Sequence, residues 1–81
     1  MKSKRIYNFT AIFQPSSEGG YVVSVPALPG CFTQGETLDE AKAMAEEAIG
    51  LYLESLIDAG EPIPEDRGEF VGHIQVKAQP A

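Results

Sequence analysis

The sequence predicts a small α+β domain in which three strands, one helix and a fourth strand follow one another. Apolar residues alternate with period two in residues 5–14 and 69–77, and residues 21–25 and 31–34 form short apolar runs bounded by glycine or proline. Between residues 37 and 60, apolar residues recur at spacings of three and four, as on one face of a helix. The expected architecture is therefore β-β-β-α-β in two layers, with the helix covering one face of the sheet.

The first strand is expected over residues 5–14, and a hairpin turn over residues 15–20 leads into a second strand at residues 21–25. Gly19 and Gly20 suit the turn because glycine adopts positive φ without steric cost. One face of the first strand is more apolar than the other and is expected to face the core. The residues of this face are Tyr7, Phe9, Ala11 and Phe13.

A proline loop over residues 26–30 separates the second strand from a short third strand at residues 31–34. Each proline fixes φ and removes a donor from the ladder, which favours a position at a sheet edge. The loop either only turns the chain or, as a stiff element, presents an exposed Leu28 to a partner protein. On the second interpretation, Leu28→Asp would weaken partner binding and leave the melting temperature nearly unchanged.

The helix begins with a capping box, in which Thr37 is the N-cap and Glu40 follows three residues later. Gly60 is the expected stop, with Pro62 just beyond it. The other helix faces are strongly acidic, which indicates either a solvated surface or one that steers a basic partner. The stripe expected to face the sheet consists of Leu38, Ala41, Ala45, Ala48, Ile49, Tyr52 and Leu56.

After a proline-stiffened connection over residues 61–66, residues 69–77 read as the last strand. A right-handed crossover through the helix would place this strand beside the first and parallel to it, which gives the sheet order 3-2-1-4. Its alternation separates an inward face from an outward face. The inward residues are Phe70, Ile74 and Val76, and the outward residues are Val71, His73, Gln75 and Lys77.

Length and charge limit the classes of function. We expect a single domain over residues 1–81 with an ordered core at about residues 5–77, and so small a core favours oligomerisation. The net charge of −6 opposes nucleic-acid binding, because only six basic residues are present and three of them are Lys2, Lys4 and Arg5. One cysteine, no secretory h-region and no membrane-length apolar run favour the cytoplasm.

The residue inventory does not favour an enzyme. Metal-dependent hydrolysis needs converging carboxylates, yet residues 5–14 and 70–77 contain no acid. His73 has no nucleophile near it in the sequence, and Cys31 has no neighbouring base to activate it. We therefore expect no catalytic residue, no metal site and no cofactor.

An ordered set of short motifs gives the chain a family resemblance. These are Gly20-Tyr21, Val23, Pro26-x-Leu28-Pro29-Gly30-Cys31, Gly35-x-Thr37, Glu40-Ala41 and Glu47-Ala48. Together they resemble the HicB-type antitoxin domain over nearly the whole chain. The resemblance implies a fold like part of ribonuclease H and a role in neutralising a small basic HicA-type toxin, which cleaves RNA with a histidine. The chain departs from the family pattern at two positions. Ala27 stands where the family often has an acidic residue, and Met44 stands where a polar residue is frequent.

Many proteins of this kind also carry a DNA-binding segment. The present sequence ends after the last predicted strand, so we expect no direct nucleic-acid binding through this chain. The main interpretation is an antitoxin-like protein that binds a HicA-like toxin, and the alternative is a stand-alone oligomeric interaction domain, a dimer or tetramer without catalytic activity. The residues expected to bind the partner are Pro26, Leu28, Pro29, Gly30, Glu40 and Glu47. Those expected to mediate self-association at a strand edge are Cys31, Phe32, Thr33, Gln34, Phe70, Val71 and His73.

Overall fold

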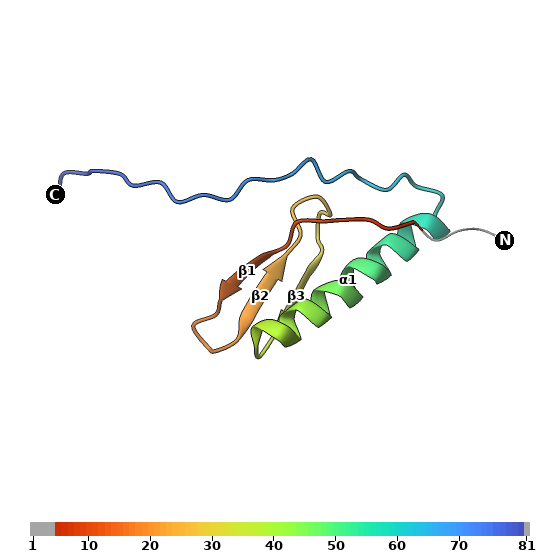
Figure 1. The fold of residues 1–81 in the computed structure, drawn as a ribbon, viewed down its shortest axis with the longest axis horizontal. Helices are drawn as coiled ribbons and strands as arrows, with labels where there is room; N and C mark the ends of the chain where they lie inside the picture. Colours follow the sequence, from red (N-terminus) through yellow and green to blue (C-terminus); the bar gives the residue numbers. More distant parts are fainter. Residues whose placement is uncertain (1–4, 81) are drawn as a thin grey trace.

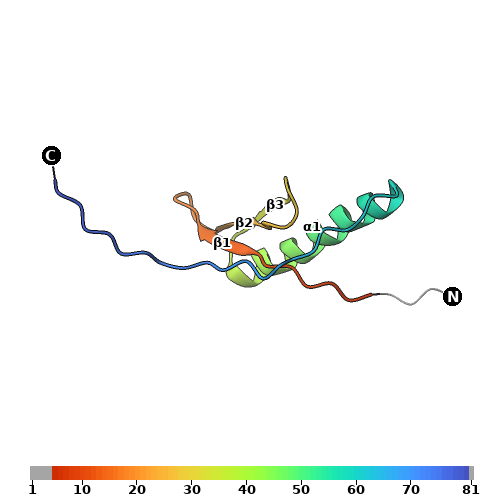
Figure 2. The ribbon, with the colours of Figure 1, turned by 90° about the horizontal axis from the view of Figure 1, so that it is seen from above.

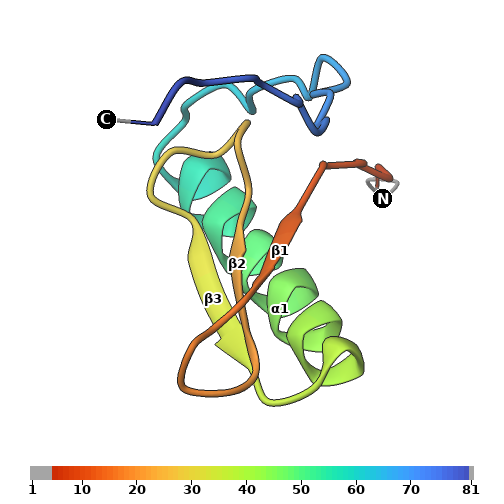
Figure 3. The same cartoon turned by 90° about the vertical axis from the view of Figure 1, so that its left-hand side faces the viewer.

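The computed structural model describes residues 5–80, so Lys2 and Lys4 of the basic N-terminal cluster lie outside the described residues. It contains strands β1 (Ile12–Pro15), β2 (Tyr21–Ser24) and β3 (Phe32–Gly35), followed by helix α1 (Leu38–Asp58) (Figure 1). The strands form an antiparallel sheet in the order β1-β2-β3, with the helix packed along it (Figure 3). The α+β class and the neighbours of the first three strands are as predicted.

The strand register separates the two faces of the sheet. Phe13 pairs with Val23, and Val23 pairs with Thr33, so these residues share one face. This is the helix-covered face, because Val23 is completely buried against the helix. The opposite face carries Phe32 and Val22, which are both exposed. Within residues 5–80, the chain therefore covers only one face of the sheet.

Glycines permit the hairpin turn between β1 and β2. Gly19 and Gly20 have φ angles of +97° and +73°, and the Ser16 amide donates to the Gly20 carbonyl over 2.9 Å. A Cβ atom on Gly20 would also lie 2.5 Å from the Gly35 carbonyl oxygen. The predicted hairpin is confirmed.

The helix begins at the predicted capping box. The Glu40 amide donates to the Thr37 hydroxyl over 3.1 Å, and the Glu40 carboxylate accepts from the Glu36 amide over 3.3 Å. Asp39 and Glu40 lie in the first turn, where the helix dipole favours negative charge.

The helix ends in a Schellman motif. Gly60, with φ +70°, donates from its amide to the Ile57 carbonyl over 3.1 Å, and Glu61 donates to the Leu56 carbonyl over 2.9 Å. Gly60 therefore ends the helix as the sequence predicts, one residue beyond the C-cap Ala59.

Two small groups of buried side chains form the core. The first lies between β2 and the helix, and the second lies between the proline loop and the C-terminal half of the helix. Phe9, Ala11 and Phe13 are only partly buried against these groups. The buried residues are Val23, Ala41 and Ala45 in the first group, and Val25, Leu28 and Cys31 in the second.

The first strand is shorter than predicted. Residues 5–14 were expected to form it, but β1 is Ile12–Pro15, and residues 5–11 precede the ladder. The reason lies in β2, which ends at Ser24, the partner of Ile12. Because Pro26 follows two residues later and lacks an amide hydrogen, the residues before Ile12 find no continuation of the ladder.

The predicted fourth strand is wrong for the chain as described. Residues 61–80 contain neither helix nor strand, and the chain after the helix runs extended beyond the sheet (Figures 1 and 2). The radius of gyration is 16.1 Å, whereas a compact chain of this length has about 12 Å. The sheet therefore holds the order 3-2-1 without position 4, and the predicted likeness to ribonuclease H stays a prediction.

Asp66 attaches the segment after the helix to the residues that precede β1. The Asp66 carboxylate accepts the Thr10 amide on one oxygen and the Gly68 amide, over 2.7 Å, on the other. Gly68 has a φ of +77°, which suits this local turn, and the chain then runs on past the sheet (Figures 1 and 2).

Acid is expected to loosen this attachment. The backbone amides of Thr10 and Gly68 lower the pKa of Asp66 below its ordinary value of 3.8. A lowered folded-state pKa gives stability that is present above pH 3.8 and is lost as pH falls through the folded-state value. Thermal melts between pH 6 and 2.5 should show a steeper loss below pH 4 for the native chain than for Asp66→Asn. Identical profiles would contradict this role.

Candidate interaction surfaces

The proline loop is a compact structure held by backbone hydrogen bonds. The Leu28 amide donates to Val25 over 3.0 Å, the Cys31 amide donates to Leu28 over 3.0 Å, and the Val25 amide donates to Cys31 over 3.2 Å. The Tyr52 hydroxyl of the helix donates to the Pro29 carbonyl over 2.9 Å. The loop is therefore tied both to itself and to the helix.

The expected exposure of Leu28 is wrong. Its side chain is 1% exposed and packs with Val25 and Cys31 above the helix. The successive turns of the loop direct it inward, which the two prolines alone did not indicate. Leu28→Asp would therefore destabilise the fold rather than act on binding alone. Pro26, Pro29 and Gly30 remain exposed, and their role in partner binding stays a prediction.

An acidic cleft lies where the hairpin turn meets the start of the helix. Three glutamates border it, and each comes from a different segment: Glu18 from the turn, Glu36 from the link after β3, and Glu40 from the helix. The other lining residues are Ser16, Gly19, Tyr21, Val22, Gln34, Gly35 and Met44. This combination offers carboxylates beside apolar contact area.

Sequence reasoning identified only Glu40 among these three acids. The strand register brings the other two to the cleft, because Pro15 pairs with Tyr21, and Tyr21 pairs with Gly35. This pairing puts the turn that carries Glu18 and the link that carries Glu36 at the same end of the sheet. Glu47 is exposed and lies two turns after Glu40 on the same helix face, outside the cleft.

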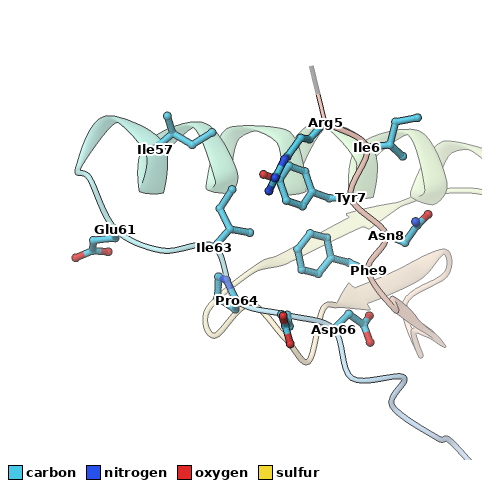
Figure 4. A pocket seen from close by; sticks show the side chains of 11 residues that line it. Arg5, Ile6, Tyr7, Asn8, Phe9, Ile57, Glu61, Ile63, Pro64 and Asp66 are labelled. Carbon is cyan, nitrogen blue, oxygen red and sulfur yellow. The ribbon is translucent and has the colours of Figure 1, made fainter. Parts of the chain in front are cut away.

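A second cleft separates the N-terminal segment from the connection after the helix. Arg5, Tyr7 and Phe9 approach Ile63 and Pro64 across it (Figure 4). The Tyr7 and Phe9 rings stack with centroids 6.5 Å apart and an interplanar angle of 20°. The remaining lining residues are Ile6, Asn8, Ile57, Glu61, Glu65 and Asp66.

The residues expected to mediate self-association lie in two separate segments. In the loop and β3, Cys31 is buried, Thr33 is half-buried, and Phe32 and Gln34 are exposed. Burial raises the pKa of the Cys31 thiol, which disfavours the reactive thiolate. Phe70, Val71 and His73 are exposed on the extended C-terminal segment. Nothing in a single chain tests their role.

Within residues 5–80, no three or more histidine, cysteine or acidic side chains converge as ligands for a metal ion. In the same part of the chain, no helix is both long enough and apolar enough to cross a membrane.

The fold and these surfaces define a small α+β domain whose prominent features are contact surfaces. The chain belongs to the HicB-like antitoxins of bacterial toxin–antitoxin systems, whose family model matches residues 9–78. It is 52% identical to a UPF0150 protein of Thermoplasma acidophilum over 78% of this chain and 91% of the relative. A UPF0150 protein of Synechocystis is 44% identical over 78% of this chain and 80% of the relative. Antitoxin HicB 1 of Photorhabdus laumondii is 39% identical over 69% of this chain and 36% of that protein.

Proposed function

We propose that this chain neutralises a small basic HicA-type ribonuclease by binding it through the acidic cleft at the hairpin and helix start. Membership of the HicB-like antitoxin family supports an antitoxin role. The acidic cleft is the observation that selects the chemistry of the partner. Its three carboxylates suit lysine and arginine side chains, which a protein that binds RNA phosphates carries on its active surface.

The rest of the helix reinforces this electrostatic preference. The helix carries six acidic residues and one basic residue, Lys42. An excess of one sign along a surface steers an oppositely charged protein during encounter. Association should therefore slow as salt concentration rises, with a smaller change in the dissociation rate.

Charge reversal tests the cleft. The double variant Glu18→Lys/Glu36→Lys should weaken toxin binding by about tenfold or more, which corresponds to about 1.4 kcal/mol. These two glutamates are chosen because the Glu40 side chain also caps the helix. Binding by isothermal titration and RNA cleavage by the toxin at increasing concentrations of this chain are the two measurements.

The double variant Glu54→Lys/Asp58→Lys is the matched control, because both residues are exposed on the helix outside the cleft. It changes charge in the same way and should alter affinity by less than about threefold, as is usual for a charge outside a contact. Equal losses in both variants would mean that general charge, not the cleft, binds the toxin. Full toxin activity at saturating concentrations of this chain would reject the inhibitor function itself.

The proposed inhibitor acts without catalysis, in the cytoplasm and without direct nucleic-acid contact. The net charge of −6 supports the absence of nucleic-acid contact, and the single cysteine supports the cytoplasm. Burial of Cys31 raises the pKa of its thiol, which disfavours its use as a nucleophile. We also propose that the domain has a fold like part of ribonuclease H.

The alternative function is a stand-alone oligomeric interaction domain. The exposed apolar residues of the C-terminal segment favour it, since they offer contact area independently of any toxin. Co-purification with the product of an adjacent gene for a small basic histidine-containing protein separates the two functions.

A further inference from the structure

The C-terminal segment has the pattern of a strand but lies outside the sheet. We call residues 69–77 the C-terminal arm. Phe70 is 93% exposed and Ile74 is 85% exposed, and Val76 on the same side is also exposed. His73, Gln75 and Lys77 alternate with them. A segment with one apolar and one polar face is typical of a strand at the rim of a sheet, with one side on a core.

The described sheet has an unpaired edge at β1, beside an apolar groove that could receive the apolar side of the arm. β1 is an edge strand of the described sheet, and the helix packs mainly on β3 and β2. An apolar groove therefore remains between residues 7–13 and the helix. Its lining residues are Tyr7, Asn8, Phe9, Ala11, Phe13, Lys42, Ala45, Glu46 and Ile49.

We propose that the C-terminal arm of each chain pairs with β1 of a second copy and covers that copy's groove. The nine residues of the arm reach about 30 Å in extended form, which exceeds the roughly 23 Å spanned by residues 7–13. With Phe70, Ile74 and Val76 facing the groove, the arm lies on the same face as the half-buried Phe9 and Phe13. Addition of this one strand thus pairs the free backbone groups at the β1 edge and buries the apolar side of the arm.

The direction of the chain selects a second copy over the chain's own sheet. Asp66 fixes the chain beside Thr10, and beyond it the arm runs on past the sheet and away from its own β1 (Figures 1 and 2). Each copy has one arm and one β1 edge beside the groove, and the other edge strand of the described sheet, β3, takes no part in the exchange. A two-fold exchange pairs both arms with both β1 edges. This assembly is independent of toxin binding, because the acidic cleft shares no lining residue with the groove.

Sedimentation of the full chain tests the assembly. We expect a mass of at least two chains at micromolar concentration. Ile74→Asp should give a monomer, because it places a charge in the groove, whereas Gln75→Asp on the polar face should keep the native mass. Both side chains are exposed in the single chain, so neither substitution removes a contact within it. A monomeric native chain, or an Ile74→Asp variant of native mass, would overturn the proposal.

Mixed isotope labelling distinguishes exchange from pairing within one chain. Labelled and unlabelled chains are refolded together, and isotope-filtered NMR records contacts between the Ile74 methyl groups and the Phe13 ring. Contacts between different chains are expected. Contacts confined to single chains would put the arm in its own sheet, and the exchange would be rejected.

Discussion

Leu28→Ala is expected to lower the free energy of unfolding by about 2–5 kcal/mol, the usual cost of removing a buried leucine side chain. Leu28 is among the few side chains that are almost completely buried, and it closes the core group formed with Val25 and Cys31. A chain of 81 residues has a total stability of roughly 4–12 kcal/mol. The substitution should therefore remove a large share of the stability, and urea denaturation with linear extrapolation measures it.

Leu51→Ala is the matched control for this prediction. Leu51 lies on the helix and is 61% exposed, so the same atoms are removed with little loss of burial. Its cost should stay within about 0.5 kcal/mol, as for most surface substitutions. If the two variants lost equal stability, Leu28 would not have the core role that its burial gives it.

The helix and the hairpin could be predicted because local signals determine them. Thr37 with Glu40, and Gly60 with the residues around it, specify the helix ends through hydrogen bonds within a few residues. Gly19 and Gly20 specify the turn in the same local way. The predicted apolar stripe of the helix is confirmed at Ala41 and Ala45, which are buried. Leu38, in the first turn, is 42% exposed.

The errors came from features that depend on distant parts of the chain. Residues 69–77 have a strand pattern, but pairing requires an edge that runs beside them, and the chain beyond Asp66 runs on past the sheet instead (Figure 1). An exposed Leu28 was one of two interpretations of the stiff proline loop, and it is wrong. Its burial depends on the helix below, including the Tyr52 bond to Pro29, which lies 23 residues away along the chain.

The same distinction applies to the candidate surface. Glu40 was found from the sequence because it belongs to a local capping motif. Glu18 and Glu36 are 18 residues apart and meet only through the strand register. Single-sequence patterns do not specify such a meeting, because the pairing of strands is decided by the whole core.

Gly35→Ala is expected to destabilise the fold by about 3 kcal/mol, at the upper end of what overpacking costs. A Cβ atom on Gly35 would lie 2.5 Å from the Ala41 amide nitrogen and 2.7 Å from the Ala41 Cα atom. These are backbone atoms of the first helical turn, so no side-chain rotation relieves the contact. The end of β3 would have to separate from the helix and open the core group of Val23, Ala41 and Ala45.

Gly50→Ala provides a control with the opposite expected sign. Gly50 lies inside the helix, and a Cβ atom there meets nothing within 4 Å. Because alanine is favoured over glycine in a helix interior by about 0.5–1 kcal/mol, this variant should be more stable than the native chain. Chemical denaturation of both variants measures the difference, and a Gly35→Ala variant as stable as the native chain would contradict the close approach of β3 to the helix. Packing thus explains the glycine at position 35. Without a Cβ atom, Gly35 allows the helix to start directly against the sheet, which also brings Glu36 and Glu40 to the cleft.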